Sequence, residues 1–239
     1  MEKVVLITGG SRGIGANAVK QFSLNGYKVA FTYLNSDKNA EDLATRYDAI
    51  AVKADMSCSN DVKNAIKVVL DKLGKIDILI NNVGISEFSL FTDITDEMWK
   101  KMLDTNLSSA FYASREVLPQ MIHRKSGCII NISSMWGEVG ASCEVHYSAA
   151  KAGIIGLTKA LAKEVAPSGI RVNCITPGAV DTDMNAVLSE DTIEGIKSET
   201  PLGKIGSVED VVNAMLFLAS DSSSFITGQI IGVNGGFVI

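Results

Sequence analysis

A tyrosine and a lysine stand four residues apart in the segment EVHYSAAKA, at Tyr147 and Lys151. On a helix, side chains at positions i and i+4 lie on one face, within a few ångströms of each other. The hydroxyl of free tyrosine has a pKa of about 10, so it is a weak proton donor or acceptor near neutral pH. Alone, the pair is typical of an ordinary helix surface, and evidence for acid–base chemistry must come from the rest of the chain.

A glycine-rich turn, TGGSRGIG, covers residues 8–15 and directly follows the first apolar run. Glycine lets the backbone turn sharply and approach a pyrophosphate closely, although any tight strand-to-helix turn also favours it. The helix that follows would offer free N–H groups to the same anion. No Gly-Lys-Ser/Thr ends the turn, so it is not a P-loop. We therefore predict a dinucleotide site that includes Gly9, Ser11, Arg12, Gly13, Ile14 and Gly15.

The residues after the second apolar run indicate which dinucleotide binds. A carboxylate at the end of that strand would bind the ribose hydroxyls of NAD and repel the 2′-phosphate of NADP. No carboxylate occurs there before Asp37, whereas the Arg12 guanidinium could bind a 2′-phosphate through two hydrogen bonds. Asn35 and Ser36 could add neutral donors, so we predict NADP(H). The alternative is that Arg12 stays solvated and Asp37 turns back onto the ribose.

Short apolar runs alternate with helical patterns along the chain. Runs that are apolar on both faces indicate a parallel sheet covered by helices on each side, with right-handed crossovers. We predict one α/β domain over residues 1–239, a doubly wound parallel sheet of the Rossmann type with about seven strands. Strands are expected at about residues 3–8, 27–33, 49–54, 75–82, 127–133, 170–176 and 228–236. Helices are expected at about residues 13–25, 37–46, 59–73, 95–124 and 147–166, and from about residue 207. Residues 180–206 are the candidate substrate lid.

Composition excludes several other classes of protein. The chain is 46% hydrophobic, and 22 basic against 27 acidic residues give a net charge of −5. These values favour a large core over disorder, and no basic stripe indicates a nucleic-acid partner. No apolar run approaches the roughly 18 residues of a membrane span, and we expect no signal peptide and a cytoplasmic protein. Two histidines and four scattered cysteines indicate no metal site.

Further motifs follow the glycine-rich turn in a fixed order. They are NNVG at 81–84, TNL at 105–107, ISS at 132–134, YSAAK at 147–151 and PG at 177–178. Together with TGGSRGIG, they resemble the short-chain dehydrogenase/reductase family over essentially the whole chain, with Val83 in place of the family's usual alanine. The resemblance implies a catalytic tetrad of Asn106, Ser134, Tyr147 and Lys151.

The resemblance also implies a role for each member of this tetrad. NADPH would deliver a hydride to a carbonyl carbon, while Ser134 and Tyr147 hydrogen-bond the oxygen on which negative charge develops. Tyr147 would donate the proton, and Lys151 would lower the pKa of the phenol and bind the nicotinamide ribose. Asn106 would hold a water that links Lys151 to solvent. Ser134 is preferred to Ser133, which alternates to the opposite face of the strand end.

The same resemblance implies further cofactor contacts and a substrate pocket. The further cofactor contacts are Asp55, Met56, Asn82, Gly84, Pro177, Gly178, Val180 and Thr182, in addition to Tyr147 and Lys151. Asp55 could also cap the helix that follows it. The expected pocket residues are Ser86, Met135, Trp136, Glu144, His146 and Met184, each of which could instead be ordinary loop packing.

Among subgroups, the chain most resembles the bacterial 3-oxoacyl-[acyl-carrier-protein] reductases, through NLSSAFYASREVLPQM and GIRVNCITPGAVDTDM. This implies a homotetramer and a ketone carried by acyl-carrier protein, with Arg124 and Lys125 as candidate contacts to the acidic carrier. Ser168, however, stands where such enzymes often have a basic residue. The segment SSMWGEVGASCEVHYSAAK also resembles reductases of a 5-aminopentanone modification on elongation factor P, and Glu138 and Glu144 would suit an amine. Two interpretations remain. The enzyme could act on another small ketone or alcohol, or the protein could be a non-catalytic NADP-binding sensor.

Overall fold

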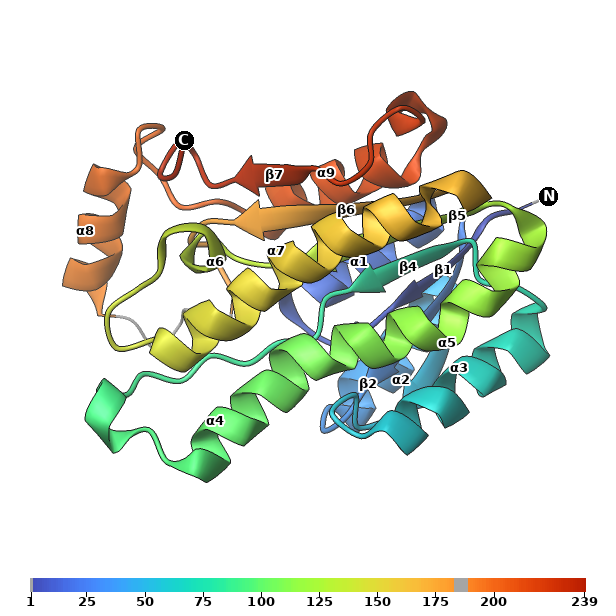
Figure 1. The fold of residues 1–239 in the computed structure, drawn as a ribbon, viewed down its shortest axis with the longest axis horizontal. Coiled ribbons are helices and arrows are strands. Elements are labelled where there is room, and N and C mark those ends of the chain that lie inside the picture. The colour runs from blue at the N-terminus through green and yellow to red at the C-terminus, as the bar shows by residue number, and fades with distance from the viewer. Residues whose placement is uncertain (1, 183–188) are drawn as a thin grey trace.

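The structure is a computed structural model of the chain and describes residues 2–182 and 189–239. Within these residues, seven strands form one parallel sheet in the order β3-β2-β1-β4-β5-β6-β7. Helices cover both faces of this sheet (Figure 1). The predicted doubly wound α/β fold is therefore confirmed. The strand order reverses between β1 and β4, and ligands of such sheets bind outside the carboxyl ends of the strands at that position.

The strands lie close to where the sequence predicts them. They are β1 Val4–Ile7, β2 Lys28–Tyr33, β3 Ile50–Lys53, β4 Ile78–Asn81, β5 Gly127–Ile132, β6 Ile170–Pro177 and β7 Ile230–Val233. Every residue of β1 and β4 is buried, because these central strands have a neighbour on each side and helices on both faces. The edge strands β3 and β7 are only partly buried.

Most helices also follow the predicted pattern. These are α1 Gly13–Leu24, α2 Asp37–Tyr47, α3 Ser59–Leu73, α4 Asp96–Leu103, α5 Ser109–Arg124, α7 Val145–Val165 and α9 Val208–Ala219. Two helices were not predicted: α6 Trp136–Val139, and α8 Glu190–Glu199 within the segment expected to form a lid. Short 3-10 segments are η1 Phe91–Asp93, η3 Ala166–Ser168 and η4 Asp221–Ser223. Within the described parts of the chain, no helix is long and apolar enough to cross a membrane.

The single helix predicted at residues 95–124 is divided in the structure. A π-helical segment, η2 Asp104–Ser108, separates α4 from α5 and carries Asn106. Such π-helical turns often occur at functional sites, because the wider turn redirects a side chain from the regular helical spacing. The prediction of one continuous helix is therefore wrong at the segment that carries Asn106, the residue that the family resemblance places in the tetrad.

Alternate strand residues pack into two hydrophobic clusters, one on each face of the sheet. Ile7, Ile80 and Ile130 belong to the cluster that includes residues of α1 and α9. Their neighbours Leu6, Leu79 and Ile129 belong to the cluster that includes residues of α3, α5 and α7. This alternation follows from the two-residue period of a strand, and it fixes which helices cover which face.

A buried polar network joins the sheet to two helices near the carboxyl ends of the strands. Asn81 of β4 donates to Asn131 of β5 at 2.8 Å and to Ser114 of α5 at 3.1 Å. Asn131 in turn donates to Thr158 of α7 at 2.9 Å. Buried polar groups need partners, so this network holds α5 and α7 against neighbouring strands. It thereby sets the position of α7, the helix that carries Tyr147 and Lys151.

Candidate active site

The turn between β1 and α1 needs glycine for its geometry. Gly9 and Gly13 have φ angles of +70° and +52°, in the left-handed region that glycine tolerates best. A Cβ added at Gly15 would lie 2.1 Å from the carbonyl oxygen of Gly9. The N-cap of α1 is Arg12, and no side chain caps this helix. The close backbone approach and the uncapped N–H groups fit the pyrophosphate of a nicotinamide dinucleotide.

The end of β4 holds this turn in place. The Nδ2 of Asn82 donates to the carbonyl oxygens of Thr8 and Gly9 at 3.0 and 3.1 Å. The Thr8 hydroxyl accepts from the backbone N–H groups of Asn82 and Val83 at 2.9 and 3.2 Å. Asn82 thus positions the glycine-rich turn, and its expected contact with the adenosine ribose stays a prediction.

Two expected contacts to the adenine lie after β3. Asp55 accepts hydrogen bonds from the N–H and hydroxyl of Ser57 at 2.9 and 2.7 Å. The alternative that Asp55 caps α3 is wrong, because the N-cap of α3 is Cys58. The side chain of Met56 is buried in the core, which leaves its backbone for the expected contact.

The loop after β6 returns to the glycine-rich turn. A Cβ added at Gly13 would lie 3.6 Å from the Cγ2 of Thr182, so the two segments are adjacent. A Cβ at Gly178 would lie 2.8 Å from the Cα of Asn234, so this position needs glycine for the close approach of the segment that follows β7. Pro177 ends β6 and Val180 is buried in the core. Their contacts with the cofactor remain predictions.

Tyr147 and Lys151 are not on a helix surface. Their exposed fractions are 9% and 4%, because α7 turns both side chains towards the end of β5. The Lys151 Nζ lies 5.7 Å from the centroid of the Tyr147 ring and donates to the carbonyl oxygen of Ile132 at 3.0 Å. Ser134 forms a hydrogen bond with the Tyr147 phenol. The structure therefore brings three of the four tetrad residues together.

The two adjacent serines after β5 have different partners. The Ser133 hydroxyl donates to the carbonyl oxygen of Lys151 at 2.7 Å and so fastens α7 to the strand. The Ser134 hydroxyl accepts from the N–H of Trp136 at 3.2 Å and reaches the phenol of Tyr147. This difference agrees with the prediction that Ser134, and not Ser133, takes part in the chemistry.

The side chains of Asn106 and Lys151 both lie against Gly84. A Cβ added at Gly84 would lie 2.8 Å from the Asn106 Oδ1 and 3.2 Å from the Lys151 Nζ. The Asn106 amide donates to the carbonyl oxygens of Ile85 and Met102, both at 3.1 Å, and accepts from the Ile85 N–H at 3.1 Å. Asn106 thus fixes the backbone beside the lysine, and its role in holding a water stays a prediction.

Burial controls the protonation of the Tyr147–Lys151 pair. It raises the pKa of Tyr147 to about 12, an effect that the nearby Glu144 increases and the hydrogen bond from Ser134 opposes. It lowers the pKa of Lys151 to about 8. Desolvation of the phenol is the largest of these effects on the Tyr147 pKa. The expectation that a charged Lys151 lowers this pKa stays a prediction. Tyr147 keeps its proton at neutral pH, which is the form that can donate.

The structure describes five of the six expected pocket residues. Glu144 is 5% exposed and accepts a hydrogen bond from the Ser86 hydroxyl, so these two residues meet beside Tyr147. Burial raises the pKa of the Glu144 carboxyl group. Met135 is buried, and Trp136 is partly exposed at the start of α6. His146 is fully buried, and neither ring nitrogen has a hydrogen-bond partner within the described residues. Met184 lies outside the described residues.

One aromatic contact beside the expected pocket was not predicted. The ring of Phe237 packs edge-on against Trp136 with 5.5 Å between the centroids. The pair joins the C-terminal segment to α6. The only signal in the sequence was an aromatic after the last strand, and such a residue occurs in many terminal segments.

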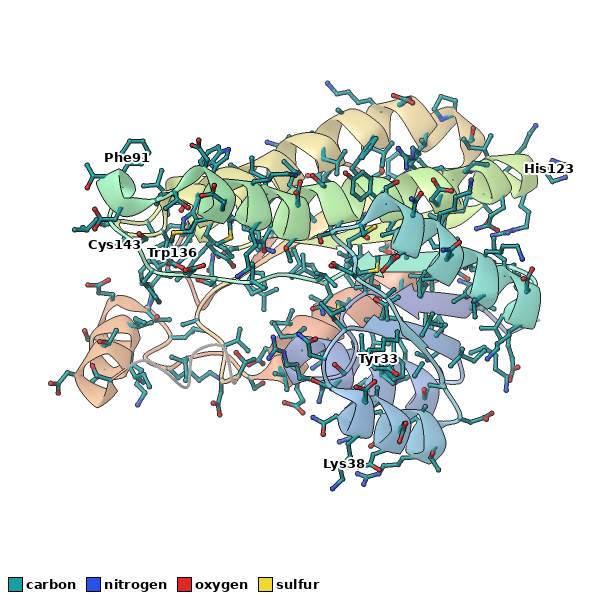
Figure 2. The ribbon with its side chains drawn as sticks, turned by 90° about the horizontal axis from the view of Figure 1, so that it is seen from below. Tyr33, Lys38, Phe91, His123, Trp136 and Cys143 are labelled. Carbon is teal, nitrogen blue, oxygen red and sulfur yellow. The ribbon has the colours of Figure 1, made fainter. Side chains whose placement is uncertain are left out.

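The basic residues proposed to contact a carrier protein do not lie beside this site within one subunit. Arg124 is the last residue of α5 and Lys125 follows it before β5, at the amino end of the sheet. Figure 2 shows their neighbour His123 at the end of the molecule opposite Trp136 and Cys143. Arg124 donates to the carbonyl oxygen of Ile76 at 2.8 Å and so fastens α5 to the chain before β4. Their contact with a carrier protein would therefore need a site shared between subunits, and it stays a prediction.

Comparison with known proteins agrees with this geometry. The chain matches a family model described as "Enoyl-(Acyl carrier protein) reductase" over residues 9–238. It is 41% identical to the 3-oxoacyl-[acyl-carrier-protein] reductase FabG of Staphylococcus aureus, over 99% of this chain and 98% of that protein. It is 43% identical to the protein of the same name from Chlamydia pneumoniae, over 98% and 96% of the two chains. This chain belongs to the short-chain dehydrogenase/reductase family. It is an oxidoreductase that acts on a ketone and uses a nicotinamide cofactor.

The contact at Gly84 makes a first prediction. In Gly84→Ala, the added methyl group meets the Asn106 Oδ1 and the Lys151 Nζ, so one of them must move. We expect ketone reduction to fall by about 100-fold, the effect of a misplaced catalytic group. We expect the overpacked site to lose about 1–3 kcal/mol of stability, measured as a lower Tm. Ketone reduction by Gly84→Ala at the wild-type rate would contradict the geometry.

The protonation of Lys151 makes a second prediction. A pKa of about 8 means that the amine is mostly charged at pH 7 and loses its charge as the pH rises through 8. We expect kcat/KM for ketone reduction to fall along an alkaline limb centred near that value, because the phenol then loses its cationic neighbour. A steady-state profile of kcat/KM between pH 6 and about 10 measures this, since kcat/KM reports the groups of the free enzyme. A kcat/KM that stays flat to pH 9.5 would argue against a titrating Lys151.

Proposed function

We propose that this protein uses NADPH to reduce the ketone of a 3-oxoacyl thioester carried by acyl-carrier protein. The observation that carries the proposal is the buried contact between the Tyr147 phenol and the Ser134 hydroxyl, beside the Lys151 amine. Two hydroxyl groups that meet at one point suit a single carbonyl oxygen. Relatives that match nearly the whole chain are named 3-oxoacyl-[acyl-carrier-protein] reductases, which supports this choice of ketone.

The chemistry assigns one task to each side chain. The nicotinamide cofactor supplies a hydride to the carbonyl carbon. As the electron pair of the C=O bond moves to oxygen, Tyr147 gives that oxygen its proton and Ser134 stabilises the developing charge by a hydrogen bond. The charged Lys151 then stands beside the phenolate and favours its formation. With a pKa of about 8, Lys151 can also return a proton to the phenol near neutral pH.

The adenosine end of the site favours NADPH over NADH. Arg12 is exposed at the start of α1, where its guanidinium can reach a 2′-phosphate. Asn35 and Ser36 lie between β2 and α2 and can add neutral donors. Asp37, the first carboxylate after β2, is paired with Lys53 at 2.8 Å. The pairing argues against the alternative in which Asp37 binds the ribose.

Two further parts of the proposal concern the lid and the assembly. Residues 180–206, which include α8, would cover the bound ketone, and α8 projects beyond the carboxyl ends of the strands (Figure 1).

A homotetramer would pair α4, α5 and α7 with their copies and use the C-terminal segment as a second interface. Exposed apolar side chains support these two proposed subunit interfaces. They are Phe111, Ile122, Val145, Phe225 and Ile239.

The direct test is NADPH oxidation with acetoacetyl-carrier protein or its small thioester analogue, in wild type and in Tyr147→Phe. The substitution removes the proton donor and keeps the ring, so we expect turnover to fall by about 100-fold or more. NADPH affinity, measured by fluorescence titration, should change little. A Tyr147→Phe enzyme with substantial reductase activity, or a wild type that does not turn over the thioester, would refute the proposal.

One observation favours a second candidate substrate, the 5-aminopentanone modification on elongation factor P. The Glu144 carboxyl group is buried beside Tyr147, with a hydrogen bond from Ser86. An acyl chain has no positive group to pair with a buried carboxylate, whereas an amino ketone carries one. The exposed Glu138 on α6 offers a second acid nearby.

A pair of small ketones separates the two candidates. If Glu144 binds an amine, 5-(dimethylamino)-2-pentanone should have a higher kcat/KM than 6-methyl-2-heptanone, which has the same shape and no charge. The tertiary amine of the first ketone is charged at neutral pH and cannot close onto the carbonyl as a cyclic imine. Glu144→Gln should then lower this preference about tenfold, the effect of one charge pair at a partly screened site. Glu138→Gln should lower this preference less, since Glu138 is exposed and water screens its charge. No preference in wild type would leave the carrier-bound thioester as the better substrate.

A further inference from the structure

Three charged or polar side chains meet at the edge of the sheet where the adenosine ribose of the cofactor is expected. Tyr33 is the last residue of β2 and Lys53 is the last residue of β3, and the parallel pairing places these two residues side by side. Asp37 is the first residue of α2, which begins four residues after β2 ends. Figure 2 shows Tyr33 on this side of the molecule, next to α2.

The contacts between them involve both oxygens of the Asp37 carboxylate. The Lys53 Nζ donates to both oxygens of Asp37, at 2.8 and 2.9 Å. Tyr33 forms a side-chain hydrogen bond with the same carboxylate. The bond with Lys53 holds the pKa of the Asp37 carboxyl below its usual range and raises the pKa of the Lys53 amine. Asp37 is therefore charged at neutral pH, and both of its oxygens face Lys53.

A free carboxylate at this edge would determine which cofactor binds. It would accept hydrogen bonds from the two ribose hydroxyls of NADH, and it would repel the 2′-phosphate of NADPH. In this chain, Lys53 neutralises the charge of Asp37 and occupies its acceptor oxygens. The phosphate then meets Arg12 and the neutral Asn35 and Ser36, without an opposing negative charge.

We propose that Lys53 makes this enzyme selective for NADPH by holding Asp37 away from the ribose, with Tyr33 as a second partner of the carboxylate. Lys53 is a positioning residue in this proposal, since it acts through Asp37. The inference rests on the proposed use of NADPH. The competing role, in which Lys53 leaves Asp37 and binds the phosphate itself, predicts different behaviour of a double variant.

The experiment compares kcat and KM for NADPH and NADH in wild type, Lys53→Gln and Lys53→Gln/Asp37→Asn. In Lys53→Gln, the released carboxylate should raise KM for NADPH about tenfold and lower KM for NADH, with kcat little changed. In the double variant no carboxylate remains, so KM for NADPH should return to within about threefold of wild type and the gain with NADH should disappear. A phosphate-binding Lys53 would give no such rescue, and that result would overturn the proposal.

Lys38 supplies the matched control. It is an exposed lysine next to Asp37 in the sequence, and it points outwards from α2 in Figure 2. Lys38→Gln removes the same charge from the same region, so an equal loss of NADPH selectivity in Lys38→Gln and Lys53→Gln would also overturn the proposal. Unchanged selectivity in Lys53→Gln would do the same. Asp37 and Lys53 are both exposed, and near-UV circular dichroism checks that each variant keeps its fold.

The wild-type measurement distinguishes a wrong cofactor from a wrong role for Lys53. If wild type uses NADH as well as NADPH, the proposed cofactor is wrong, and there is no selectivity for Lys53 to create. If wild type prefers NADPH and the Lys53 variant keeps that preference, only the role of Lys53 fails.

Discussion

The burial of one amine organises the centre of this structure. A lysine amine removed from water favours its neutral form unless the protein supplies acceptors, and Lys151 has the carbonyl oxygen of Ile132 at 3.0 Å. The surrounding backbone must come close for this contact to form. A Cβ at Gly137 would lie 2.7 Å from the carbonyl carbon of Lys151, and one at Gly84 would lie 3.2 Å from its Nζ. Two of the chain's glycines therefore serve the packing around this lysine.

The parallel sheet supplies the rest of the site, because all its strands end at the same edge. The Thr8–Asn82 contacts join β1 to β4 where the strand order reverses, and they hold the glycine-rich turn. The network of Asn81, Asn131 and Thr158 holds α7 on the adjacent strands. Cofactor turn and catalytic helix are thus fixed to the same few strands. A site divided between distant segments of the chain becomes rigid in this way, as catalysis by positioned groups requires.

Several features could not be read from residue types and spacing. The interruption of the helix at η2 depends on the amide of Asn106 finding partners at Ile85, twenty-one residues away. The α8 helix lies in a segment with little apolar periodicity, which is the main sequence signal for a helix. The end of the molecule occupied by Arg124 depends on the direction of β5. Each of these properties comes from contacts between distant segments, for which local sequence carries little information.

The sequence by itself determined the alternation of strands and helices, the glycine-rich turn after β1, and the order of the tetrad residues. These follow from apolar periodicity, from the backbone needs of a tight turn and from motif spacing, all of which are local. Only the tertiary structure decided the pKa values of Tyr147 and Lys151. Burial raises the pKa of Tyr147 to about 12 and lowers that of Lys151 to about 8. Solvation depends on everything that packs around a group, and a spacing of four residues cannot report it.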